Sequence, residues 1–255
     1  MTRFKRKVPG LTIVELLVSV GVISLLAAIL LPAMSAGRQA AKDLECRAQF
    51  RDVTQRFINF ADDSGVGLRG ESQSLGGRFQ IEDFQDSLYQ VDEFWVGPES
   101  ERTQVDAGAS PLMCPASAGA LERRAGLPCS SGGIGPAKNV STGFNKRLET
   151  RTREVRGRLL PANAYLSSRI LTMPDVPLVF DVDGQQAAER GVLPLYSAPP
   201  ILTDKWIDIY ESGKNWFPSF RHRGRMNVAF VGGHVLSTIH PTEEPWWQWN
   251  YQPDS

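Results

Sequence analysis

The sequence has few of the residues that build metal centres and active sites. It contains only three cysteines and three histidines in 255 residues, and none of them stands in a paired Cys or His motif. No nucleophile is placed beside a base, and no pair of carboxylates has a recognisable catalytic spacing. We therefore predict no metal ion, no cofactor and no catalytic residue.

The sequence also lacks an excess of charge of either sign. It has 28 basic and 28 acidic side chains, and four of the basic ones lie in the first ten residues. Without these ten residues, 24 basic side chains face 28 acidic ones, a net charge of about −4, which excludes a globally basic nucleic-acid binder. The one basic stretch, 146–158, has no aromatic residue to stack on bases. We interpret it as a solvent-exposed hairpin or loop, with a nucleic-acid or anionic-polymer contact as the less favoured alternative.

Ionisable side chains are almost absent from residues 11–34, where Glu15 is the only one. This run is long enough to cross the apolar core of a bilayer, about 30 Å thick, as one helix. Basic residues next to such a helix stay in the cytoplasm. The ten residues before it contain four: Arg3, Lys5, Arg6 and Lys7. The sequence therefore predicts a single-pass membrane protein with a cytoplasmic amino terminus and an external head.

Glu15 needs a positive partner, because a carboxylate inside a membrane helix is costly and usually has a function. No basic residue lies between Lys7 and Arg38. Cleavage of the chain before Leu11 would create an α-amino group, which is charged near neutral pH because its reference pKa is about 8. Glu15 would then lie one helical turn from this amine, and could pair with it or with that of a neighbouring subunit.

This arrangement resembles the class III signal of type IV pilins and type II secretion pseudopilins: a short basic leader ending in Gly10, then LTIVELLV with glutamate fifth after the cut. The resemblance implies that prepilin peptidase cleaves after Gly10 and methylates Leu11. It implies that Glu15 orients subunits in a filament, and that Gly21 and Pro32 bracket a helix segment that loosens on assembly. The implied partners are other pilin-like subunits, an inner-membrane assembly platform and membrane lipid. The implied location is the cytoplasmic (inner) membrane of a bacterium, with a periplasmic or extracellular head.

Two other interpretations of this run stay open. One is a conventional secretory signal with a cut near residues 33–36, and the other is an uncleaved membrane anchor for an enzyme. The length of the apolar run and the presence of Glu15 argue against the first of these.

Residues 35–61 are predicted to continue the helix as an amphipathic stem, because apolar residues recur there at spacings of 4, 3, 4 and 3. These residues are Cys46, Phe50, Val53, Phe57 and Phe60. We expect this apolar side to pack on a head formed by residues 62–255, with Cys46 as a small packing residue.

The head offers few chemical signals. Cys114 and Cys129 lie in a loop rich in Gly, Pro and Ser, and they are candidates for a disulfide outside the cytoplasm, with two free thiols as the alternative. Residues 181–184, DVDG, begin like a calcium loop, but the later ligands do not follow, so we interpret them as a turn.

The strongest head signal is the run MNVAFVGGHVLSTI, 226–239, which predicts a β-hairpin. With His222 it resembles the carboxy-terminal signature of a pilin-like family common in planctomycete-type bacteria, in which nine residues separate a histidine from Asp-Gly. Here Gly232 replaces the aspartate and Gly233 is kept. We interpret His222 as a structural histidine.

The tail EPWWQWNY is aromatic, with Trp246, Trp247 and Trp249 as its tryptophans. Tryptophan faces can bind a sugar or a partner protein, whereas the favoured interpretation is that the tail folds back to cover a sheet edge.

The sequence therefore predicts an α+β fold in which a long amino-terminal helix, half membrane-spanning and half amphipathic, packs on an antiparallel sheet. The expected function is a structural subunit of a membrane-anchored filament, in a type II secretion or type IV pilus-like system. The alternatives are a minor pilin or adhesin whose aromatic tail binds a surface glycan, and a membrane-anchored enzyme.

Overall fold

The computed structural model describes residues 12–66, 77–89, 104–105, 113–117, 121–122, 140–190, 197–200, 213–249 and 251. By its contacts the chain divides into two compact units, Met1–Ala41 and Lys42–Ser255. Gly10, Leu11 and Cys129 lie outside the described residues, so the predicted cleavage junction stays a prediction. Of the predicted disulfide pair, Cys114 is a free, buried cysteine, which favours the alternative of free thiols.

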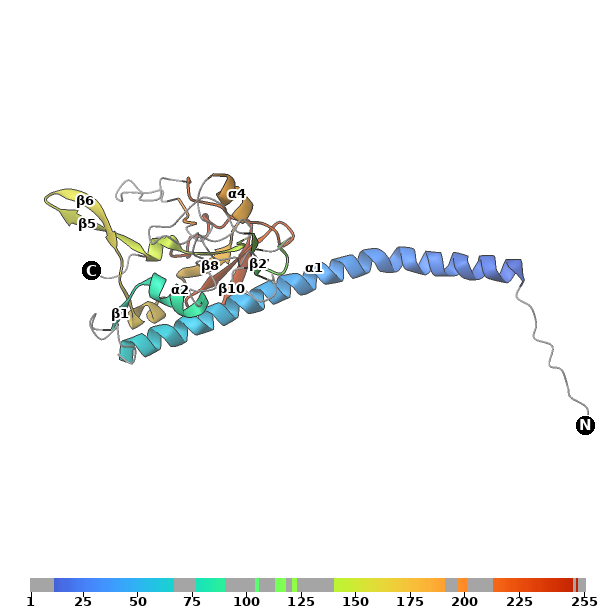
Figure 1. The fold of residues 1–255 in the computed structure, drawn as a ribbon, viewed down its shortest axis with the longest axis horizontal. Helices are drawn as coiled ribbons and strands as arrows, with labels where there is room; N and C mark the ends of the chain where they lie inside the picture. Colours follow the sequence, from blue (N-terminus) through green and yellow to red (C-terminus); the bar gives the residue numbers. More distant parts are fainter. Residues whose placement is uncertain are drawn as a thin grey trace, which may run out of the picture. The chain divides into compact units, whose positions relative to one another are not determined.

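A single helix, α1 (Ile13–Val66), dominates the amino-terminal part of the chain (Figure 1). It contains no break at Pro32. Between Ile13 and Met34 its large apolar side chains are exposed, and the helix is long and apolar enough to cross a membrane. Exposed apolar surface of this extent requires a lipid or protein environment. Two serine hydroxyls in this part donate to carbonyl oxygens of the preceding turn, Ser19 to Glu15 and Ser24 to Val20, which satisfies them without water.

The head is built on a four-stranded antiparallel sheet in the order β10-β9-β8-β4. Its strands are β4 (Thr142–Phe144), β8 (Pro177–Asp181), β9 (Met226–Phe230) and β10 (Val235–Thr238). Together with α1, this sheet confirms the predicted α+β fold. The predicted hairpin at 226–239 is also confirmed, because β9 and β10 pair in antiparallel register from Val235 opposite Ala229 to Thr238 opposite Met226.

The other described elements of the head are smaller, and the β5–β6 hairpin projects away from the sheet (Figure 1). Three two-stranded ribbons pair β1 (Arg78–Phe79) with β7 (Leu166–Ser167), β2 (Gln104–Val105) with β3 (Leu121–Glu122), and β5 (Thr150–Val155) with β6 (Arg158–Asn163). The helices are α2 (Ile81–Tyr89), η1 (Lys146–Leu148), η2 (Ser168–Thr172) and α4 (Gly184–Glu189).

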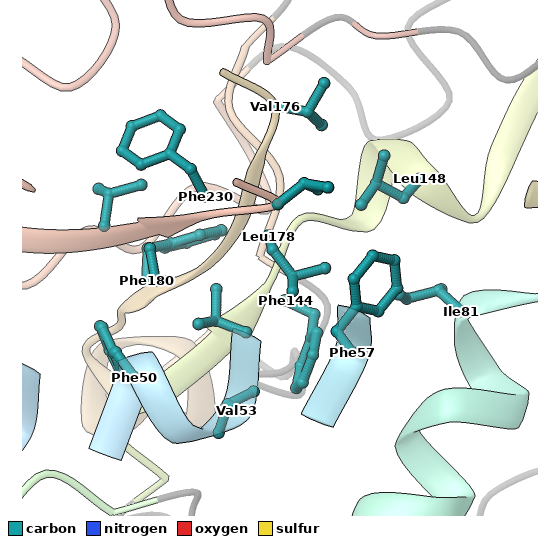
Figure 2. Close-up of a cluster of buried hydrophobic side chains, with 14 of the residues drawn as sticks. Phe50, Val53, Phe57, Ile81, Phe144, Leu148, Val176, Leu178, Phe180 and Phe230 are labelled. Atoms are coloured by element: carbon teal, nitrogen blue, oxygen red, sulfur yellow. The ribbon is translucent and has the colours of Figure 1, made fainter. Parts of the chain in front are cut away.

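The stem, defined here as residues 42–66 of α1, packs on one face of the sheet as its periodicity predicts. All five residues of the apolar stripe are at most 5% exposed. Phe57 makes an edge-to-face contact with Phe84 of α2, and Phe84 makes another with Phe144 of β4. Figure 2 shows Phe50, Val53 and Phe57 on the helix, with Phe144 and Ile81 in the same cluster. The helix ends at Val66 rather than at the predicted residue 61, so it continues through Gly65, although glycine lowers helix stability by about 1 kcal/mol relative to alanine.

Side-chain alternation along β8 assigns the two faces of the sheet. Asp181 contacts Cys46 of the stem, so it lies on the stem face. Phe180 therefore points to the other face, where its ring contacts Trp216 and Trp249. On β9, Phe230 contacts Trp247 on the same side. The tryptophans thus cover the sheet face opposite the stem.

The basic stretch 146–158 forms η1 and the hairpin β5–β6, and residues 153–158 are exposed as expected. Lys146 and Arg147 differ from the prediction, because both are buried. Lys146 pairs with Glu149, and Arg147 donates from Nε and from Nη2 at 2.5 Å to the carbonyl oxygen of Pro199. The first two basic residues of this stretch therefore make an ion pair and hydrogen bonds inside the head instead of facing solvent.

The segment DVDG is a helix start rather than a simple turn. Asp183 accepts a hydrogen bond at 3.0 Å from the backbone N–H of Gln186, which is the contact of a helix amino-terminal cap. Asp181 ends β8 and points into the head. The two carboxylates therefore have separate structural roles.

Candidate functional site

The predicted assembly residue, Glu15, forms a capping box with Thr12 at the start of α1. Its carboxylate oxygen Oε2 accepts hydrogen bonds from the Thr12 backbone N–H at 2.9 Å and from the Thr12 hydroxyl at 2.8 Å. In return, the Glu15 backbone N–H donates to the Thr12 hydroxyl oxygen at 3.3 Å. This reciprocal pattern fixes the first helical residue. Only a charged partner was predicted for Glu15 from the sequence, and Thr12 was not predicted as its hydrogen-bond partner. The spacing T-x-x-E, which is the signature of a capping box, could have indicated it.

A second group of chemically active side chains lies inside the head. Four residues each contribute one atom that can bind a metal ion, and these four atoms all lie within 4.8 Å of one another. The residues are Cys46, Cys114, Asp181 and His222. All four residues are buried, with exposed fractions of 0% for the first three and 5% for His222. They come from four separate segments: the stem, residues 113–117, the end of β8 and the bend before β9. We call these four residues the buried cluster.

Three distances define the geometry of the buried cluster. The Sγ atom of Cys114 lies 3.2 Å from Nε2 of His222. The same Nε2 lies 3.4 Å from Oδ2 of Asp181, whose other oxygen, Oδ1, lies 3.7 Å from Sγ of Cys46. The imidazole nitrogen therefore faces a sulfur and a carboxylate oxygen at the same time.

Neighbouring residues orient His222 and Asp181. Nδ1 of His222 lies 3.2 Å from Oδ1 of Asp43, a carboxylate one turn before Cys46 on the stem. Asp43 in turn accepts hydrogen bonds from Arg47 at 2.9 Å and from the Asn227 side chain at 3.1 Å. The backbone N–H of Asn227 donates to Oδ2 of Asp181 at 2.8 Å. The ring of His222 is thus held with Nδ1 toward Asp43 and Nε2 toward the buried cluster.

Local sequence explains how His222 reaches this position. The segment RHRGR forms a tight turn in which Arg223 and Gly224 have positive φ angles of 54° and 77°. His222 and Arg225 flank this turn and exchange two backbone hydrogen bonds, of 3.2 and 3.0 Å. Glycine adopts such angles without strain, which explains its place in this turn. The turn fixes the backbone of His222 next to the start of β9.

Charge interactions set the protonation of the buried cluster. The hydrogen bonds from Cys46 and His222 outweigh burial and lower the pKa of Cys114 to about 5. Donation to Cys114, together with burial, raises the pKa of Cys46 well above its ordinary range. Burial lowers the pKa of His222, but hydrogen bonds and charges from Asp181 and Cys114 raise it to about 9. These shifts favour a Cys114 thiolate beside a protonated His222, with Cys46 as a neutral thiol.

A thiolate next to an imidazolium is the pair used by cysteine nucleophiles. Reactive cysteines, however, are partly exposed, whereas Cys114 and Cys46 are free cysteines that are both fully buried. The arrangement is suited to holding a small ion or to fixing the head.

From the sequence, Cys46, Cys114 and His222 were each assigned a separate role and were not predicted to form one site. Asp181 was interpreted as part of a turn. The spacings explain this, because 135 residues separate Cys46 from Asp181 and 108 separate Cys114 from His222. Sequence motifs for metal ligands depend on short, fixed spacings. Here the sheet and the stem bring the residues together, so no local pattern could have revealed the cluster.

The glycines of the family-like signature lie in the turn between β9 and β10. Gly233 has a φ of 84°, a conformation that favours glycine. A Cβ atom on Gly232 would lie 2.7 Å from Cβ of Pro174 and 3.0 Å from its carbonyl oxygen. The family's aspartate therefore has no room at position 232 in this chain.

The tryptophans predicted as a ligand surface are mostly inside the head. Trp247 and Trp249 are buried, and the indole N–H of Trp249 donates to the carbonyl oxygen of Pro241 at 2.7 Å. Trp246 is 44% exposed. The tail folds back as the favoured interpretation states, although it covers a face of the sheet rather than an edge.

Comparisons of the chain with protein-family profiles, with curated proteins and with solved structures gave no match. The likeness to pilins thus rests on the residues of the amino-terminal segment and of the His222 signature.

Proposed function

We propose that this protein is a pilin-like (pseudopilin) structural subunit, processed by a prepilin peptidase and assembled into a membrane-anchored filament. The observation that carries the proposal is the start of the chain. A basic leader ending in Gly10 precedes an apolar helix in which Glu15 is the only ionisable side chain before Arg38. A membrane anchor alone has no use for a carboxylate in this position.

The capping box supports this role by placing Glu15 within the first turn of α1. Thr12 holds one carboxylate oxygen at the amino-terminal end of the helix, close to the position where cleavage would create the new amine. A carboxylate at a helix amino terminus is also stabilised by the helix dipole. Glu15 is thus held ready to interact with its own amino terminus or with that of an adjacent subunit.

The head supports a structural role in the same filament. The stem carries its apolar stripe into the head core, so the helix and the sheet form one folded unit within residues 42–255. The two alternative functions have less support. Trp247 and Trp249 are buried, which removes most of the expected glycan surface, and the four residues of the buried cluster are at most 5% exposed.

Mass spectrometry of the mature protein tests the proposal. The full-length chain is co-expressed with a prepilin peptidase and recovered from the membrane. We expect a protein that begins at Leu11 and carries one methyl group, and we expect the variant Gly10→Asp to stay uncleaved. A mature protein that begins beyond residue 33, or a wild-type chain left intact by an active peptidase, would overturn the proposal.

A further inference from the structure

The buried cluster has no part in the proposed assembly step. Its four residues are all of types that bind metal ions. We propose that Cys46, Cys114, Asp181 and His222 bind one zinc-class divalent transition metal ion, which fastens the stem to the head. This inference does not depend on the filament function, because the cluster lies wholly within the unit Lys42–Ser255.

The spacing of the donor atoms fits tetrahedral coordination. Zinc binds sulfur at about 2.3 Å, and nitrogen and oxygen at about 2.0 Å, so neighbouring ligands of a tetrahedral site lie about 3.3 to 3.8 Å apart. Three distances within the cluster are close to this range: 3.2 Å from Cys114 to His222, 3.4 Å from His222 to Oδ2 of Asp181, and 3.7 Å from Oδ1 of Asp181 to Cys46. One ligand atom from each of the four residues lies within 4.8 Å of the other three, so the four donors are close enough together to share one ion.

The donor types select a zinc-class ion. Two cysteine sulfurs, one imidazole and one carboxylate suit zinc, whereas calcium and magnesium require a shell made of oxygen atoms. A set of four protein ligands leaves no coordination position for a substrate or water. Together with the burial of all four residues, this indicates a structural site rather than a catalytic one.

The residues around the cluster match the outer shell of a metal site. Metal-binding histidines almost always donate their second ring N–H to a carboxylate or carbonyl, and Nδ1 of His222 faces Asp43 at 3.2 Å. The backbone N–H of Ala116 donates to Sγ of Cys114 at 3.4 Å. The backbone N–H of Asn227 holds the Asp181 oxygen Oδ2, which leaves Oδ1 directed toward Cys46.

Charge balance also favours an ion in this place. Asp181 is fully buried, and a buried carboxylate needs compensating positive charge and hydrogen bonds around it. Two thiolates and Asp181 would carry three negative charges, of which a divalent metal neutralises two. The guanidinium of Arg221, 3.9 Å from Asp181, compensates the third and is itself held by the carbonyl oxygens of Ser141 and Val182.

We expect the bound metal ion to hold together segments of the head that are far apart in the sequence. The metal would join the stem, residues 113–117, β8 and the turn before β9 at one point. Because such a site does not exist in the unfolded chain, binding free energy becomes folding free energy. The metal ion would set the position of the stem against the sheet.

Metal analysis of the full-length protein in detergent, purified under reducing conditions without chelators, tests this proposal. We expect one zinc per chain. Cys114→Ser and His222→Ala should lose the metal, whereas His240→Ala, which changes an exposed histidine outside the cluster, should keep it. Asp43→Asn should keep the fold but weaken zinc binding about 10- to 100-fold, as loss of an outer-shell partner does.

A second measurement needs no variant, and so it holds even if the cysteine and histidine variants fail to fold. The wild-type protein is stripped of metal and titrated with Co²⁺, and we expect the absorption bands of a tetrahedral cobalt–thiolate centre and a higher Tm. A folded wild-type protein that takes up neither ion would overturn the proposal. So would a Cys46–Cys114 disulfide detected by mass spectrometry in protein isolated without reductant.

Discussion

At the scale of single residues, Glu15 has a helix-cap role in the structure and an assembly role in the proposed function, and one pair of substitutions can separate them. The capping box needs a hydrogen-bond acceptor at position 15, and glutamine serves as well as glutamate. Pairing with a new amino terminus needs the charge. Glu15→Gln should therefore be processed and inserted normally but should fail to assemble, whereas Thr12→Ala keeps the charge and should assemble.

The measurement is the amount of filament recovered per amount of mature, membrane-inserted subunit. Loss of assembly in Thr12→Ala together with normal assembly of Glu15→Gln would show that Glu15 acts only as a helix cap. Normal assembly of Glu15→Gln would contradict a role for its charge.

Gly232 gives a second prediction at this scale, and it concerns stability. A Cβ atom there would meet Cβ of Pro174 at 2.7 Å, and neither the proline ring nor the adjacent carbonyl can rotate away. Gly232→Ala should lower the free energy of unfolding by about 1–3 kcal/mol, which is typical of overpacking. Gly233→Asn is the comparison variant, because the nearest atom to a Cβ there is 3.7 Å away, so it introduces backbone strain at a φ of 84° without overpacking, and asparagine tolerates that φ better than most residues. Thermal unfolding of both variants checks this, and an unchanged Tm for Gly232→Ala would contradict it.

At the scale of the elements, the stem is the part that the sequence predicted best. Its stripe of apolar residues has a local helical period, so a pattern within one segment was enough to assign both the helix and its buried side. The hairpin β9–β10 was predicted for the same reason, since its two strands flank a Gly-Gly turn. The pairing of β8 with β4 and β9 was not predicted, because it depends on contacts between segments far apart in the chain.

The packing of the stem gives an element-scale prediction. Phe57 is fully buried and contacts the rings of Phe79 and Phe84. Phe57→Ala should therefore destabilise the head by about 3–5 kcal/mol, through lost burial and the cavity left behind. Gln55→Ala, two residues away on the exposed side of the same helix, should change the stability by less than about 0.5 kcal/mol. Denaturant unfolding of both variants measures this difference, and similar values would mean that the stem does not contribute to the head core.

The buried cluster shows why chemistry was harder to predict than shape. Cys46 belongs to the apolar stripe by its spacing, and the structure does bury it with that stripe. Its second property, the contact with Asp181, appears only after the stem is docked on the sheet. Asp181 likewise has the sequence context of a strand end, and nothing nearby in the chain indicates that it faces two cysteines and a histidine.

At the scale of the whole molecule, the two units differ in where their apolar side chains lie. The large apolar side chains of residues 13–34 are exposed, whereas the unit Lys42–Ser255 has a core of its own whose first member is Cys46. A hydrophobic core that draws on no described residue before the stem should form without the apolar segment 13–34. The fragment 42–255 should therefore fold, stay monomeric without detergent, and unfold within a few degrees of the full-length protein.

This prediction is checked by expressing residues 42–255 in an oxidising compartment and in the cytoplasm, followed by size-exclusion chromatography and thermal unfolding monitored by circular dichroism. The fragment 62–255 is the control, because it lacks the stem stripe from Cys46 to Ala61 and loses both the Phe57 contacts and one corner of the buried cluster. We expect this shorter fragment to aggregate or to remain unfolded. If fragment 42–255 behaved in the same way, the membrane segment would have to supply part of the stability of the head. If fragment 62–255 folded as well as the longer one, the stem would be an attached helix rather than part of the core.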